Sequence, residues 1–90
     1  MEAWKILESL ENIADKLDIE IVYENISSDE FLSNGGICKF KGQYKIFIDP
    51  REPLKKKIAI LARALSSFDT EDIYMPPFIR ETLEMAKDDK

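Results

Sequence analysis

The chain of 90 residues contains no histidine and only one cysteine, Cys38. Histidine is the most common general base at neutral pH and the most common zinc ligand, so its absence excludes a large part of enzyme chemistry. A single cysteine cannot form an intramolecular disulfide, and the remaining candidate ligands are carboxylates, which suit hard cations. The sequence also lacks the spaced carboxylates and glycine of a calcium loop. We therefore expect no metal and no cofactor.

Long apolar runs and an excess of basic residues are also missing. No apolar run approaches the roughly 18 residues that a membrane span requires, and the start "MEAWKILESL" lacks the layout of a secretion signal. We therefore expect a cytoplasmic protein with no membrane association. With 18 acidic and 13 basic residues the net charge is −5, which repels phosphate backbones and disfavours nucleic acid as a partner.

The residues that are present predict one small globular domain over 1–90, with 87–90 as a flexible tail, because 44% of the chain is hydrophobic and 34% is charged. Apolar residues from Ala3 to Leu17 recur at steps of three and four, which predicts an amphipathic first helix. In "DIEIVYENI" the period changes to two, which predicts a strand. The turn formers of "SSDEFLSNGG" then predict a loop.

A hairpin is predicted over "ICKFKGQYKIFID", with Gly42 at its tip. A three-residue loop, 41–43, best matches apolar residues across the two strands, since it places Phe40 opposite Tyr44 and Cys38 opposite Ile46. In this register Cys38 is a core residue. Ile37 and Phe47 then lie together on the opposite face, and we expect another surface to cover them.

Two helices are predicted after the hairpin. Pro53 fits the first position of a long helix whose apolar stripe runs through Leu54, Ile58, Leu61, Leu65 and Phe68, and the pair Pro76 and Pro77 opens a short C-terminal helix. The sequence thus predicts an α+β fold: an N-terminal helix, a three-stranded and mainly antiparallel sheet with a hairpin, a long helix packed on the sheet, and a short final helix.

This order of elements, with "KIFID" followed by "IAILARALSSF", resembles the minimal zinc-peptidase domain of the ImmA/IrrE type, in which a helix carrying H-E-x-x-H follows such a strand. In that comparison Arg63 and Ser67 stand where the family has its two zinc-binding histidines, and Ala64 stands where it has its catalytic glutamate. The resemblance therefore implies a degenerate scaffold without metal or peptidase activity. The chain also resembles short bacterial proteins that share a G-G-[IL]-C, [FI]-[IV]-D and L-P-P pattern.

Several residues are candidates for a functional role, each beside a purely structural interpretation. Arg63 covers one side of the long helix with its aliphatic stem, or it binds a carboxylate with help from Arg51 in a cleft that also holds Ser67 and Asp49. Cys38 is either a buried small hydrophobe or a reactive thiol. The residues Tyr74, Met75 and Phe78 of "IYMPPF" close the core or form a protein interface.

Three classes of function follow from these candidates. The first, which we favour, is a non-catalytic interaction or scaffold domain that binds a protein partner or a second copy of itself, through Ile37 and Phe47. The second is an enzyme that uses Cys38 or a carboxylate such as Asp49 without metal. The third is a regulatory domain that binds a small anionic ligand or an acidic peptide at Arg63 and Arg51.

Overall fold

The elements of the structure follow the order that the sequence predicts. The computed structural model describes residues 2–24 and 37–88, and its elements are α1 (Ala3–Lys16), β1 (Glu20–Tyr23), β2 (Ile37–Phe40), β3 (Gln43–Ile48), α3 (Leu54–Leu65) and α4 (Pro77–Asp88). The α+β fold class is confirmed. The loop expected over 27–36 lies outside the described residues, and residues 87 and 88 belong to α4 rather than to a tail.

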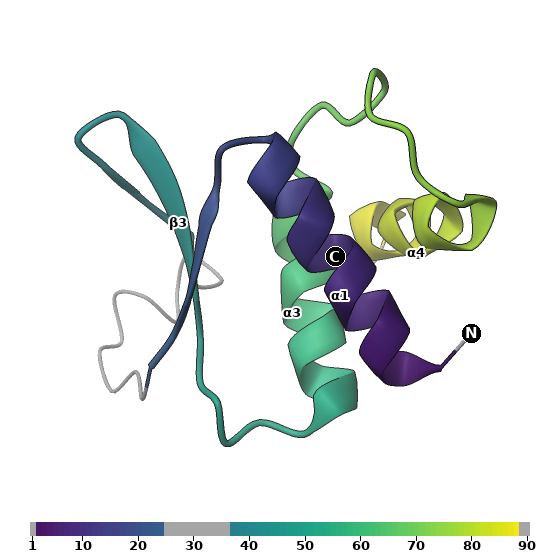
Figure 1. Cartoon of the computed structure of the whole chain (residues 1–90), viewed down its shortest axis with the longest axis horizontal. Coiled ribbons are helices and arrows are strands. Elements are labelled where there is room, and N and C mark those ends of the chain that lie inside the picture. The colour runs from purple at the N-terminus through teal and green to yellow at the C-terminus, as the bar shows by residue number, and fades with distance from the viewer. Residues whose placement is uncertain (1, 25–36, 89–90) are drawn as a thin grey trace.

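The helices all lie on one side of the sheet. Figure 1 shows the sheet at one edge of the molecule, α3 and α1 beside it, and α4 on the far side of these two helices. α3 is the central element, since it contacts the sheet, α1 and α4. Its buried residues Leu61, Ala62, Ala64 and Leu65 therefore face three different neighbours.

α1 ends in a Schellman motif, which turns the chain into β1. Asp18 has a positive φ of 61°, its N–H bonds the carbonyl of Asp15, and the N–H of Ile19 bonds the carbonyl of Ala14. This pattern satisfies carbonyl groups that a helix C-terminus leaves free, and aspartate is one of the few residues other than glycine that adopts the left-handed conformation. Ile19, the next residue, is buried. The motif thereby fixes where β1 enters the core.

The sheet is mixed, with strand order β1-β3-β2. β2 and β3 form the expected antiparallel hairpin, whereas β1 runs parallel to β3 and pairs Ile21 with Ile46, so the sheet is mixed rather than mainly antiparallel as predicted. An ion pair between Glu20 and Lys45, 3.6 Å apart, joins the same two strands on the face that points away from the helices. β3 is therefore the centre of the sheet.

The register of the hairpin differs from the predicted one by one residue. Its loop has two residues, Lys41 and Gly42, with φ of 52° and 83°, and Cys38 pairs with Lys45 while Ile37 pairs with Ile46. Positive φ at both loop positions is the signature of a type I′ turn, whose twist matches that of the strands. The prediction from matching apolar residues was wrong because the twist of this short turn decides the register.

A shift of one residue moves every side chain of β2 to the other face of the sheet. Ile37 therefore packs against the core beside Ile46, while Cys38 and Phe47 lie on the face that points away from the helices. Cys38 is half-buried rather than a core residue. The predicted pairing of Ile37 with Phe47 on one spare face is likewise wrong.

One core joins all the elements. Its fully buried large side chains come from α1, β3, α3 and α4 and are Leu10, Ile46, Ile48, Leu61, Leu65 and Ile79. No buried residue within the described ranges is polar or charged, and no buried side-chain polar atom there lacks a hydrogen-bond partner. The interior is thus apolar, and the charged side chains are left to the surface.

α3 ends earlier than its apolar pattern predicts. The helix stops at Leu65, and the hydroxyl groups of Ser66 and Ser67 each donate to a carbonyl three residues back, those of Arg63 and Ala64, at 2.7 Å. Serine side chains that bond nearby backbone groups compete with continued helix formation. Phe68 consequently lies outside the helix. Its ring packs edge-to-face with the ring of Tyr44, and the two ring centroids are 5.0 Å apart.

Candidate functional site

α3 presents a positively charged strip on its outer side. Its sequence LKKKIAILARAL contains four basic residues and no acidic one, although the whole chain carries −5. Lys55, Lys56, Ala59 and Arg63 are exposed and lie on one side of the helix, opposite the buried Leu61. We call these four residues the α3 strip. Because α3 alone contributes +4, the strip is positive within an otherwise strongly negative molecule.

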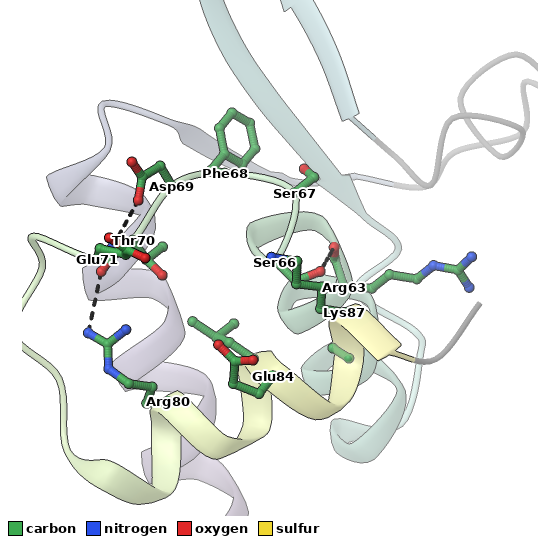
Figure 2. A pocket seen from close by; sticks show the side chains of 12 residues that line it. Arg63, Ser66, Ser67, Phe68, Asp69, Thr70, Glu71, Arg80, Glu84 and Lys87 are labelled. Carbon is green, nitrogen blue, oxygen red and sulfur yellow. Dashed lines mark hydrogen bonds between the residues drawn. The ribbon is translucent and has the colours of Figure 1, made fainter.

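The cations of the α3 strip have no carboxylate partner within residues 2–24 and 37–88. The two ion pairs found there involve other residues, Lys45 with Glu20 and Arg51 with Asp49. Figure 2 shows the Arg63 guanidinium extending away from the neighbouring acidic side chains. Among the described residues, the charge of the strip is thus not neutralised by an ion pair.

A groove between α3 and α4 lies along this strip. It has a volume of about 560 Å³, and its lining combines the strip with Ile58, Ile60 and Ala62 of α3 and with Thr82, Met85 and Ala86 of α4. Met85 is 73% exposed and is the largest uncovered apolar side chain of this surface. Cations therefore border a groove whose floor consists of alanine and isoleucine side chains. Such a surface offers both apolar contact and attraction for negative charge.

A second hollow of about 620 Å³ lies between the C-terminal end of α3, the following loop and α4 (Figure 2). Several of its polar groups make hydrogen bonds that hold the local fold. The Arg80 guanidinium donates to the carbonyls of Thr70 and Ile73 at 3.3 Å and 2.8 Å, and Asp69 accepts the N–H of Glu71 at 3.0 Å. Arg80 thereby holds the loop against α4. Arg63 borders both hollows, and its guanidinium extends outward (Figure 2).

The structure separates two pairs of residues that the sequence groups in one cleft. Arg63 and Ser67 line the second hollow, but Ser67 lies beyond the end of α3 and Ala64 is 3% exposed in the core. Asp49 and Arg51 lie before the first turn of α3, about 14 Å or more along its axis from Arg63. There the Arg51 guanidinium donates to both carboxylate oxygens of Asp49, at 3.1 Å and 2.9 Å. These hydrogen bonds and the guanidinium charge hold the pKa of Asp49 below its ordinary value.

The three residues of "IYMPPF" have different surroundings. Met75 is buried and closes the core, as the structural interpretation predicts, while Tyr74 is 84% exposed and Phe78 is about half exposed. Phe78 lies on the first turn of α4, and the Thr82 hydroxyl donates to its carbonyl at 2.9 Å. Phe78 and Thr82 stand one turn apart on the helix that also carries Met85. Phe78 therefore continues the exposed apolar surface of α4 toward its N-terminus.

Tyr23 connects three elements at the other end of α3. Its hydroxyl donates to a carboxylate oxygen of Glu11 on α1, and the Lys57 ammonium lies 5.9 Å from its ring centroid. Partial burial, followed by the hydrogen bond to Glu11 and the charge of that carboxylate, raises the pKa of Tyr23 well above its ordinary value. The cluster fastens β1 to α1 and α3. Neither Tyr23 nor Glu11 was among the residues that the sequence singled out.

The groove residues Lys55, Lys56 and Met85 were also missed as candidates, although a signal was present. The run "KKK" and the absence of acidic residues from 54–65 set this segment apart from the rest of an acidic chain. Met85, by contrast, has no signal of its own, because only the packing of α4 on α3 exposes it beside the strip.

Comparisons with protein-family models, with curated proteins and with solved structures found no match to this chain. Within the described residues no cluster of three or more acidic or cysteine side chains is arranged to hold a metal ion. No helix in the part of the chain that the structure describes is both long and apolar enough to cross a membrane. The function of the groove between α3 and α4 therefore has to be inferred from the residues that line it.

Proposed function

We propose that the chain is a non-catalytic protein-interaction domain that binds its partner in the groove between α3 and α4. This proposal is carried by the cations of the α3 strip, which have no carboxylate partner among the described residues, together with the exposed Met85 of α4 in the same groove. Charged borders around an apolar surface are typical of sites where two proteins associate.

The resemblance to the ImmA/IrrE type enters this proposal as a scaffold whose catalytic positions serve other purposes. Arg63 is exposed, Ala64 packs in the core, and Ser67 lies beyond the helix. These positions support a binding function because one of them now contributes charge to the groove. Stoichiometric zinc in elemental analysis, retained after chelation, would contradict this part of the proposal.

Site-specific photo-crosslinking tests the proposed function. A photoreactive amino acid replaces Met85 in the native cell, and a second variant carries it in place of Trp4, which is half exposed on α1 and is absent from the groove lining. We expect a defined covalent adduct from position 85 and none from position 4. No adduct at all, or the same adduct from both positions, would overturn the proposal.

A further inference from the structure

We infer that the partner segment is an acidic amphipathic helix whose carboxylates stand seven residues apart. This inference rests on the proposed function and specifies the chemistry of the partner at the same groove. It follows from the spacing of charge along α3, from the small residue at its centre and from the helical walls of the groove.

Lys56 and Arg63 are seven residues apart, which is about two helical turns and about 10 Å along the axis. Both are exposed, and neither has a carboxylate partner within the described ranges. A helix that lies alongside α3 repeats this distance when its own acidic residues are seven apart, because residues at that spacing return to the same face. Each carboxylate then meets one cation.

The middle of the α3 strip fits an apolar contact. Ala59 lies between the two cations and is exposed, and Ile60 beside it is half-buried. A small side chain at the closest point allows two helices to approach to the usual distance of about 8 to 10 Å. Met85 on the opposite wall supplies a flexible apolar surface that adapts to the partner's side chains. Apolar residues three and four positions after the partner's first carboxylate would reach this part of the groove.

The charge of the whole chain favours an acidic peptide over nucleic acid. The strip holds three cations, whereas the molecule as a whole carries −5 and repels an extended phosphate backbone. A short helix with two carboxylates engages the strip and contributes apolar area, which a nucleic acid backbone does not.

The experiment uses the full chain and a designed helical peptide of about 20 residues, with two glutamates seven apart and two leucines between them. We expect a dissociation constant of about 10 to 100 µM by NMR titration, since exposed ion pairs contribute little each. Changes in backbone chemical shift should be confined to the groove residues. Binding should weaken when salt rises from about 50 mM to about 500 mM.

Charge-reversal variants provide the matched comparison. Lys56→Glu and Arg63→Glu should each weaken binding by about fivefold or more, because an attractive pair becomes a repulsive one. Lys5→Glu makes the same change of net charge at an exposed site on α1 and should leave binding within about twofold. Peptide variants with both glutamates changed to glutamine, or with a central proline that breaks the helix, should bind poorly.

Four outcomes would overturn the inference. These are no binding of the peptide, equal binding to the Lys5 and Lys56 variants, equal binding of the proline peptide, and tighter binding of a DNA or RNA oligonucleotide of similar length that the two reversals abolish. A crosslinked partner at position 85 without peptide binding leaves the proposed function standing and refutes the acidic helix. If neither a crosslink nor peptide binding is found, both the proposed function and the acidic-helix inference are refuted.

Discussion

At the scale of single residues, Tyr23 does more for the fold than its position at the end of a strand suggests. Its ring and hydroxyl contact side chains of two helices, Glu11 on α1 and Lys57 on α3. A hydroxyl that bonds a carboxylate loses this partner when phenylalanine replaces tyrosine, while the ring contacts persist. The effect of the hydroxyl can therefore be measured alone.

We expect Tyr23→Phe to lower the free energy of unfolding by about 1 kcal/mol, as measured by urea denaturation at neutral pH. The matched control is Tyr74→Phe, at a side chain that is 84% exposed, and it should leave the stability unchanged. Equal stability of the Tyr23 variant and the unaltered protein would show that the hydrogen bond to Glu11 contributes nothing.

The same variant tests the direction of the pKa shift. The pKa of Tyr23 is raised in the folded state, by partial burial first and then by Glu11, so its contribution to stability is fully present below the unfolded pKa of about 10. Above that pH the unfolded state loses the proton first and becomes relatively more stable. The stability advantage over Tyr23→Phe should therefore shrink as pH rises above about 10. An advantage that grows over this range would mean that the shift has the opposite sign.

The hairpin loop is a second feature at this scale, because its positive φ angles make stability sensitive to substitution. Gly42 has a φ of 83°, and a Cβ added there would meet no atom within 4 Å, so backbone strain rather than a steric clash sets the effect of a substitution. We expect Gly42→Ala to destabilise the protein by about 1 kcal/mol in thermal unfolding. Lys41→Asn, at the other positive φ, should be neutral or stabilising, because asparagine tolerates this conformation. A neutral Gly42→Ala would mean that the two-residue loop is not the one that forms.

At the scale of elements, the twelve residues of α3 pack against the sheet, α1 and α4, and they also form part of the surface. Ala64 faces the core, whereas Ala59 faces the groove, and the two are five residues apart on the same helix. Ala64 is thus a packing position of α3.

We expect Ala64→Glu to prevent stable folding, because it places a carboxylate in an apolar interior without a partner and costs about 3 kcal/mol or more. Ala59→Glu introduces the same residue on the exposed side of α3 and should change the stability by about 0.5 kcal/mol or less. Circular dichroism and urea denaturation distinguish the two. If the Ala64→Glu variant folded and its carboxylate titrated like an exposed one, that side of α3 would lie at the surface.

At the scale of the whole molecule, one core joins α1, β3, α3 and α4, so these elements should unfold together. Leu10 on α1 is fully buried in that core, and the single tryptophan, Trp4, lies on the same helix. Fluorescence of Trp4 and far-ultraviolet circular dichroism therefore report on a local and a global part of the same transition.

We expect the two signals to give the same denaturation midpoint, and Leu10→Ala to lower the free energy of unfolding by about 3 kcal/mol. This is a large share of the roughly 5 to 10 kcal/mol that stabilises an ordinary small domain. Glu8→Ala, on the exposed side of α1, serves as the control and should have little effect. Separate midpoints for the two signals would show that α1 detaches before the rest of the core.

The amino-acid sequence by itself determined the elements and their order. Apolar residues at steps of three and four define α1 and the buried side of α3, and Pro53 and Pro77 stand at the start of two helices. These features are local, since helical periodicity and the fixed φ of proline act within a few residues. The positive charge of α3 is also a property of the sequence.

The tertiary structure alone decided which surfaces those elements share. The twist of a two-residue turn set the register of β2 and moved Cys38 out of the core, and two serines that bond back to α3 ended this helix before Ser67. The groove exists only because α4 packs on α3 and leaves Met85 beside Arg63. The register and the helix end depend on a competition between close local alternatives, which the packed structure resolves. The groove depends on the relative placement of segments distant in sequence, so none of the three follows from a residue pattern alone.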